Sequence, residues 1–235
     1  MKNTALRLIT NRSDYDFTVA RDYDKIAETY SKAYVDQRSA TENEFIRKLI
    51  NKLIEEPVVD FGCGHGVLFD WYPDLDGYGQ DVSAKMLEIA RQRHPNKEFV
   101  LGSMLDFHEL RFVNAFSTAT CLFGGGVSYC EDLTKASNVI FDCLRPGGKF
   151  LAMFAGTTHP GCAVLHDFGL EDKAYKRTVN ELIDVFKIRF RDVRIISAFN
   201  RRFKSLFLTR LESYYLTNFR PNSANYHIVI GNKPE

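Results

Sequence analysis

Three glycines, each separated by one residue, follow the short apolar stretch Val58–Phe61: Gly62, Gly64 and Gly66. Glycine lacks a Cβ and adopts positive φ readily, so such a loop can turn sharply and let a ligand lie against bare main chain. The residues after the loop are expected to begin a helix, whose first N–H groups are free to bind a ligand. The spacing therefore predicts a loop that binds a nucleotide-like ligand.

The loop departs from the dinucleotide-binding pattern G-x-G-x-x-G, because Val67 stands where that pattern requires its third glycine. Downstream, Gly77–Asp81 is predicted to be a short strand that ends in an acid, about 20 residues beyond the loop. Nucleoside-binding folds place a carboxylate there to accept hydrogen bonds from the ribose hydroxyls. Ser83 follows as the expected N-cap of the next helix.

Four motifs in this order resemble those of the class I S-adenosylmethionine-dependent methyltransferases: Val58–Gly66, Gly79–Leu87, Phe99–Asp106 and Leu144–Phe150. The resemblance implies an α/β fold, in which a Rossmann-like, doubly wound, mostly parallel seven-stranded sheet has its last strand antiparallel and carries an N-terminal helical lid. It also implies S-adenosylmethionine as the methyl donor and S-adenosylhomocysteine as the product. No metal is expected.

The resemblance assigns cofactor-binding roles to residues along these motifs. Asp81 is expected to bind the ribose, Asp60 to position the methionine portion, and Met86 to pack on the adenine. Ser103 stands where the family often has an acid, so its hydroxyl or backbone would recognise the adenine amine. The full set of expected cofactor residues is Tyr23, Tyr30, Asp60, Gly62, Cys63, Gly64, Asp81, Val82, Met86, Ser103, Met104 and Cys121.

Several of these residues also have a structural interpretation. Asp60 could cap the amides of the glycine loop, and Met86 could be a core methionine. Tyr23 and Tyr30, seven residues apart and so on one helix face, could bind the cofactor carboxylate or staple the lid to the domain. Cys63 is interpreted as a small packing residue rather than a nucleophile.

The segment Phe123–Tyr129, at the end of the predicted fourth strand, is expected to border the methyl acceptor. It lacks the Asp/Asn-Pro-Pro-aromatic tetrapeptide of amino-methylating DNA enzymes and is more similar to small-molecule N- and O-methyltransferases. Its Tyr129 could shape the acceptor pocket or pack. His159, in the loop after the predicted fifth strand, is the candidate catalytic base, because an unperturbed histidine pKa suits proton transfer.

The predicted activity is transfer of a methyl group from S-adenosylmethionine to a nitrogen or oxygen of a small-molecule metabolite, by in-line SN2 displacement. Two alternatives keep the fold: methylation of RNA or of a protein side chain, and non-catalytic binding of S-adenosylmethionine. A nicotinamide-dependent oxidoreductase is a third alternative, and Val67 argues against it.

Composition limits the partners. The 235 residues carry a net charge of +1, with 31 basic against 30 acidic side chains, which gives no overall attraction to nucleic acid or anionic lipid. We expect a small-molecule acceptor, no DNA, no membrane, and a monomer or homodimer; RNA is disfavoured. The five cysteines are scattered without a C-x-x-C pair, which indicates neither a disulfide framework nor a zinc site and suits a reducing, cytoplasmic location.

Strands and helices are expected to alternate along the chain, as in a parallel sheet with right-handed crossovers. The predicted strands are Pro57–Phe61, Gly77–Asp81, Glu98–Gly102, Ala115–Phe123, Lys149–Ala155, Arg191–Phe199 and Tyr226–Gly231.

The chain is expected to hold one domain. Residues 1–22 would be a mobile N-terminal arm, and residues 23–235 a single methyltransferase domain. Within that domain, residues 23–55 would form the lid, with one helix over Asp24–Tyr34 and a second opened by a capping box at Thr41–Glu44. Residues 200–222 would be an aromatic insertion near the acceptor site, and their pattern suits either extra strands or a helix and loop.

Overall fold

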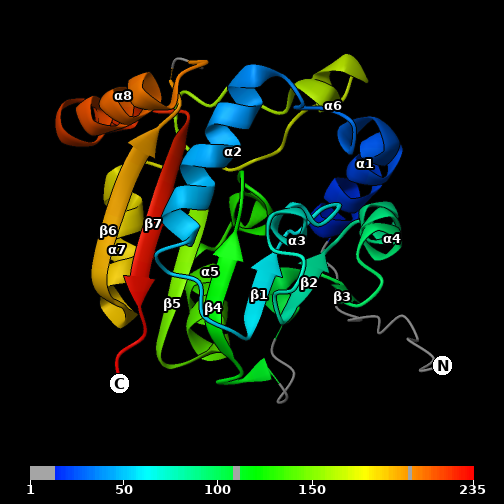
Figure 1. Ribbon diagram of the computed structural model, residues 1–235, viewed down its shortest axis with the longest axis horizontal. Coiled ribbons are helices and arrows are strands. Elements are labelled where there is room, and N and C mark those ends of the chain that lie inside the picture. Colours follow the sequence, from blue (N-terminus) through cyan, green and yellow to red (C-terminus); the bar gives the residue numbers. More distant parts are fainter. Residues whose placement is uncertain (1–13, 108–111, 201–202) are drawn as a thin grey trace.

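The fold is that of a computed structural model, which describes residues 14–107, 112–200 and 203–235. Seven strands form one sheet in the order β3-β2-β1-β4-β5-β7-β6, and β7 is antiparallel to both of its neighbours. The mostly parallel, doubly wound sheet predicted from the sequence is confirmed (Figure 1). The strands are β1 (Val58–Phe61), β2 (Gly77–Asp81), β3 (Glu98–Leu101), β4 (Phe116–Cys121), β5 (Leu144–Ala155), β6 (Arg191–Ala198) and β7 (Tyr226–Asn232).

Helices cover both faces of the sheet, so its central strands are buried on both sides. Along β1 the side chains alternate, and Val59 and Phe61 pack on one face while Val58 packs on the other. The first face is covered by α5 and α7, and the second by α2, α3 and α4. The helices are α1 (Asp14–Tyr30), α2 (Gln37–Ile50), α3 (Val67–Trp71), α4 (Ala84–Arg93), α5 (Leu133–Cys143), α6 (Ala163–Asp167), α7 (Val179–Arg189) and α8 (Leu206–Phe219).

The carboxyl ends of the parallel strands meet at one edge of the sheet, and α1 and α6 lie at that edge (Figure 1). Open α/β sheets bind their ligands there, outside the strand ends. Among the described residues, no helix combines the length and apolar character needed to cross a membrane.

The N-terminal helices begin earlier than the sequence suggested. The first runs Asp14–Tyr30 instead of Asp24–Tyr34, so part of the expected arm is helical. The second begins at Gln37, because the side chain of Asp36 accepts hydrogen bonds from the Arg38 and Ser39 amides. The capping box at Thr41 is therefore wrong: Thr41 lies inside the helix and donates to the Gln37 carbonyl at 2.8 Å. The division into an arm and a domain stays a prediction.

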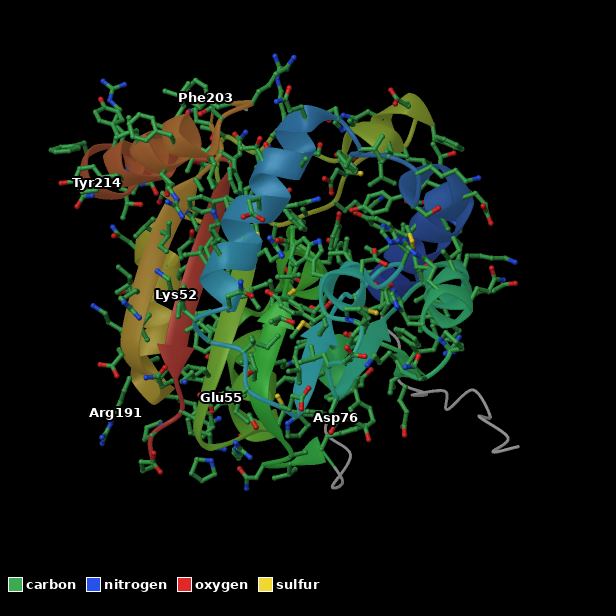
Figure 2. The ribbon with its side chains drawn as sticks, viewed as in Figure 1. Lys52, Glu55, Asp76, Arg191, Phe203 and Tyr214 are labelled. Carbon is green, nitrogen blue, oxygen red and sulfur yellow. The ribbon has the colours of Figure 1, made fainter. Side chains whose placement is uncertain are left out.

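The aromatic segment of the C-terminal third forms a helix, α8, which settles the alternative that its sequence pattern left open. Its buried side is made by Thr209, Ser213 and Leu216. Its aromatic residues point largely outward, and Figure 2 shows Tyr214 on the outer side of the helix, where it is 67% exposed. Neither of the two site cavities described below takes a lining residue from this helix.

Candidate cofactor and acceptor site

The glycine loop after β1 needs its glycines for two different reasons. Gly62 (φ +64°) lies against the main chain that follows β4, and a Cβ built on it would come within 2.0 Å of the Gly126 nitrogen. Gly64 (φ +53°) has no atom within 4 Å of its Cβ position. Both conformations disfavour a side chain. Gly62 therefore permits the packing of two loops, whereas Gly64 borders open space.

Asp81 ends β2 and holds the glycine loop in place. Its Oδ2 accepts a hydrogen bond from the Gly64 amide and its Oδ1 accepts one from the Ser83 amide, both at 2.8 Å. Burial raises the pKa of this carboxyl to about 6, although the two amides oppose the shift. A carboxylate so oriented has lone pairs left to accept the hydrogen bonds of ribose hydroxyls.

Asp60 is fully buried one residue before β1 ends. Its Oδ1 accepts a hydrogen bond from the Thr120 hydroxyl on β4 at 2.8 Å. The loop amides of Gly62 and Gly64 donate elsewhere, to Gln80 and Asp81, so Asp60 is not the cap of the loop. Burial raises the pKa of Asp60 to about 7, and the nearby Asp81 charge adds to the shift.

The predicted cofactor residues gather around two connected cavities. The first, of about 90 Å³, lies over the carboxyl ends of β1, β2 and β3. Asp60 and Cys63 line the larger cavity instead, and Cys121 lines neither: its buried Sγ accepts a hydrogen bond from the Val127 amide at 3.4 Å. The predicted residues lining the first cavity are Tyr23, Tyr30, Gly62, Gly64, Asp81, Val82, Met86, Ser103 and Met104.

The second cavity, of about 410 Å³, is bordered mainly by side chains from segments far apart in the sequence. Tyr23, Tyr30 and Tyr129 line both cavities and therefore stand at their junction. A group transferred from a ligand in the first cavity to one in the second would pass this junction. Other aromatic residues of the second cavity are Tyr34, Trp71, Phe123, Phe199 and Tyr226.

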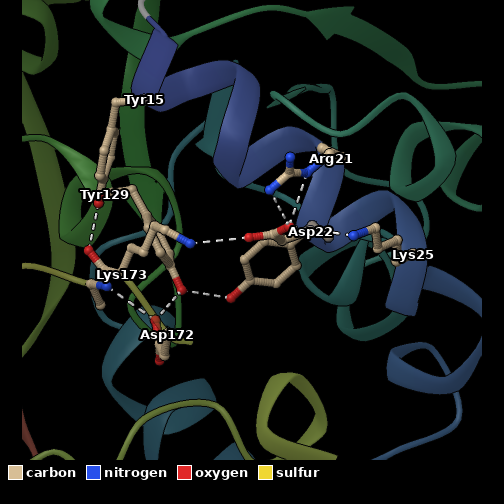
Figure 3. Close-up of polar contacts among 9 residues, drawn as sticks. Tyr15, Arg21, Asp22, Lys25, Tyr129, Asp172 and Lys173 are labelled. Atoms are coloured by element: carbon tan, nitrogen blue, oxygen red, sulfur yellow. Dashed lines mark hydrogen bonds and ion pairs between the residues drawn. The ribbon is translucent and has the colours of Figure 1, made fainter. Parts of the chain in front are cut away.

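The helix α1 is tied over the cavities by side-chain hydrogen bonds. The Asp24 carboxylate accepts from the Ser83 hydroxyl at 2.6 Å and from the Lys85 amide at 3.0 Å, at the start of α4. Lys173 forms an ion pair with Asp22 at 3.1 Å (Figure 3). These contacts make α1 a lid, whose inner face carries the half-buried Tyr23 beside Tyr30 and Tyr129.

His159 lines the second cavity, as its place after the predicted fifth strand suggested, but its hydrogen bonding does not suit a base. Its Nδ1 accepts a hydrogen bond from the Gly161 amide at 3.1 Å, and burial lowers its pKa. The neutral imidazole then carries its proton on Nε2 and has no free lone pair. This geometry favours a role for His159 as a hydrogen-bond donor rather than as the general base.

Two site residues were given no role from the sequence, Gln80 inside the second motif and Asp172 outside all of the motifs. Gln80 accepts a hydrogen bond from the Gly62 amide and donates to the Gly102 carbonyl, which connects the loop after β1 to the end of β3. A polar residue beside the acid of a buried strand was the available signal. Asp172 lies in an irregular segment between α6 and α7, where no periodicity marks it. No group of three or more metal-ligating side chains occurs in the described ranges.

Solved structures place this chain in a known fold class. A Thermotoga maritima protein, described as a SAM-dependent methyltransferase and possible histamine N-methyltransferase, superposes with a TM-score of 0.64 at 17% identity. The superposition covers 91% of this chain and 99% of that one. The chain therefore has the S-adenosylmethionine-dependent methyltransferase fold.

At the level of sequence, residues 58–148 match the family described as "Methyltransferase domain". A demethylmenaquinone methyltransferase of Thermotoga maritima is 32% identical over 52% of this chain, and 54% of its own length is covered. A Streptomyces fradiae dTDP-3-amino-3,6-dideoxy-alpha-D-glucopyranose N,N-dimethyltransferase is 32% identical over 48% of this chain and 42% of its own length. The chain thus spans about half the length of these relatives.

Proposed function

We propose that this chain transfers a methyl group from S-adenosylmethionine to a nitrogen or oxygen of a small molecule. The observation that carries the proposal is the junction at Tyr23, Tyr30 and Tyr129. It joins the smaller cavity, built by the glycine loop and Asp81, to a larger cavity suited to an acceptor. The names of the relatives, a quinone methyltransferase and an amino-sugar dimethyltransferase, support small molecules as the acceptor class.

The residues present fit the cofactor. Gly64 offers main chain without a side chain, and Asp81 offers a carboxylate fixed by two amides. Asp60 precedes the loop and Asp81 accepts from its Gly64 amide, and their pKa values are about 7 and about 6. Binding of a cation beside them favours their ionised forms. A cofactor with a positive sulfur and a positive amino group therefore matches this site better than an anionic dinucleotide does.

S-adenosylmethionine supplies a methyl group on a positive sulfur, which becomes a neutral thioether when the acceptor's lone pair takes the methyl. The chain has to hold the acceptor in line with the carbon–sulfur bond and keep water out. Burial raises the pKa of Tyr23 and of Tyr30 well above the usual range, so both hydroxyls stay protonated and serve as hydrogen-bonding groups. The lid contacts of Asp24 and Asp22 close the site around the junction.

The acceptor cavity favours a small molecule over RNA or a protein. Its volume of about 410 Å³ lies within the range of small-molecule sites, roughly 300–1,000 Å³. The net charge of +1 also gives little attraction to a phosphate backbone. Binding of the cofactor without turnover of any acceptor would instead favour a regulatory protein on the same scaffold.

Isothermal titration calorimetry with S-adenosylmethionine, S-adenosylhomocysteine and NAD tests the cofactor assignment. We expect both sulfur nucleosides to bind and NAD not to bind. Gly64→Ala should weaken S-adenosylhomocysteine binding at least about tenfold, which corresponds to about 1.4 kcal/mol, because its methyl group would enter ligand space. Gly169→Ala is the matched control, since Gly169 (φ +69°) is exposed and also has no atom near its Cβ position. Binding of NAD alone would refute the proposal.

A further inference from the structure

Asp172 places a carboxylate at the wall of the acceptor cavity. Its Oδ1 accepts hydrogen bonds from the Tyr129 hydroxyl at 2.8 Å and the Ala174 amide at 3.0 Å. Its Oδ2 accepts one from the Cys162 amide at 2.6 Å. All three donors are neutral, and a carboxylate has about four acceptor positions. The side chain is therefore fixed by its neighbours and retains acceptor capacity.

No cation of the described chain compensates this charge. The adjacent Lys173 extends the other way and pairs with Asp22 on the lid (Figure 3). Among the described residues that line the cavity, Arg93 is the one with a lysine or arginine side chain. Its guanidinium forms an ion pair with Asp70 at 2.6 Å. Burial lowers the pKa of His65 to about 4 and also lowers that of His159, so both imidazoles are neutral near pH 7.

A hydrogen-bond chain leads from Asp172 to the junction of the two cavities. Because a carboxylate can only accept, the Tyr129 hydroxyl donates to Asp172. The Tyr23 hydroxyl lies 2.7 Å from that of Tyr129 and therefore donates to Tyr129 in turn. The position where the methyl group would be transferred is thus connected to a fixed negative charge.

Aromatic rings surround the same space. Tyr30 forms edge-to-face pairs with Tyr23 and Tyr34, with ring centroids 5.9 Å and 5.6 Å apart. Tyr226 lines the cavity beside His159, with centroids 4.7 Å apart. Tyrosine rings attract cations through their electron-rich faces, and the attraction grows where water is excluded. A carboxylate among such rings is the arrangement that selects a positively charged ligand.

We propose that the acceptor is a small molecule that carries a positively charged amine, held by Asp172 and the tyrosine rings of the acceptor cavity. The inference rests on the proposed function, since it names the acceptor class of the same site. It makes Asp172 the residue that distinguishes an amine from a neutral compound of the same shape.

Calorimetry on the full chain saturated with S-adenosylhomocysteine tests this inference with two matched probe pairs. Tyramine is compared with its neutral alcohol analogue tyrosol, and choline with 3,3-dimethylbutan-1-ol. We expect each amine to bind at least about tenfold more tightly than its neutral partner. Raising the salt concentration should weaken the binding of the amines and leave the binding of the alcohols unchanged.

Asp172→Asn should reduce the preference for each amine to less than about threefold, while S-adenosylhomocysteine binds as before. Glu171→Gln is the matched control, because it removes the same charge from the exposed neighbouring residue and should preserve the preference.

Equal binding of amine and alcohol by the unmodified protein would overturn the inference, as would a preference that survives in Asp172→Asn. The comparison in the unmodified protein decides even if Asp172→Asn does not fold. If the unmodified protein does not bind S-adenosylhomocysteine, the proposed function is refuted instead. The two failures are therefore distinguishable.

Discussion

The two cavities of the site are bordered by different parts of the fold. The first is bordered by main chain and by residues that directly follow β1, β2, β3 and β4, with the lid above. The second shares the loops after β1 and β4 with the first, and adds side chains from the segments around Tyr34, Glu42, His159, Asp172 and Tyr226. The ends of the parallel strands therefore position the cofactor site, whereas the acceptor site also depends on packing between segments distant in the sequence.

This difference explains why one cavity was visible in the sequence. A ligand site formed by main chain at the strand ends requires glycine where no Cβ fits, as at Gly62. It also requires an acid at a strand end, as at Asp81. Such demands fix residue types at fixed spacings. A cavity of tyrosines can be assembled from any segments that the fold brings together, so it leaves no spacing to recognise.

The largest effect is expected for Gly62→Ala, in the glycine loop of the cofactor site. Its methyl group would lie 2.0 Å from the Gly126 nitrogen, and main chain cannot move aside as a flexible side chain can. We expect a loss of about 3 kcal/mol or more in the free energy of unfolding. That corresponds to a fall in melting temperature of about 10 °C, measurable by calorimetry.

Gly169→Ala separates this clash from backbone strain. Gly169 also has a positive φ, +69°, but no neighbouring atom lies within 4 Å of its Cβ position. A left-handed alanine costs roughly 1–2 kcal/mol. Equal destabilisation by the two substitutions would show that Gly62 is needed for its conformation alone and not for packing of the two loops.

Asp81→Asn probes the second demand of the cofactor site. The substitution removes the charge that accepts hydrogen bonds from Gly64 and Ser83 and would accept those of the ribose. Hydrogen bonds to a charged group contribute about 1.5–3 kcal/mol, so S-adenosylhomocysteine should bind about 10- to 100-fold more weakly by calorimetry. Asp76→Asn is the control, because exposed Asp76 precedes the same strand at the opposite edge of the sheet (Figure 2). A similar loss in both variants would contradict the assignment.

Asp60→Asn tests the charge of the acid that faces the acceptor side. The pKa of Asp60 is about 7 in the folded protein against an ordinary value of 3.8. Its contribution to stability is therefore fully present below pH 3.8 and is lost as the pH rises through about 7. Asparagine can still accept from Thr120 and carries no charge. The variant should gain about 1 kcal/mol over the unmodified protein at pH 8 and little at pH 4.

Chemical denaturation at several pH values measures this difference. Asp81, with a pKa of about 6, titrates in both proteins, so the comparison isolates Asp60. A stability difference that does not change between pH 4 and pH 8 would show that Asp60 is already ionised, or stays neutral, throughout that range.

The sequence predicted the strands and the positions of the glycine loop and Asp81, because strand periodicity and glycine spacing are local signals. The antiparallel last strand followed from the family resemblance and not from any local pattern. The sequence placed the start of α2 wrongly, since Thr41 and Glu44 resemble a cap that Asp36 in fact provides. It named His159 and Tyr129 but not Asp172, whose role depends on contacts between segments distant in the chain. Hydrogen-bond direction, which decides the tautomer of His159, exists only in the folded structure.

The smallest expected effect falls on the aromatic helix α8, and it decides how far the acceptor site extends. Tyr214 is 67% exposed and lines neither cavity, so Tyr214→Ala should change stability by less than about 0.5 kcal/mol. Leu216→Ala, two residues away and 4% exposed, should cost about 2 kcal/mol or more. Neither change should alter tyramine binding to the S-adenosylhomocysteine complex. A weaker affinity for tyramine in Tyr214→Ala would show that α8 does shape the acceptor site, as its sequence predicted.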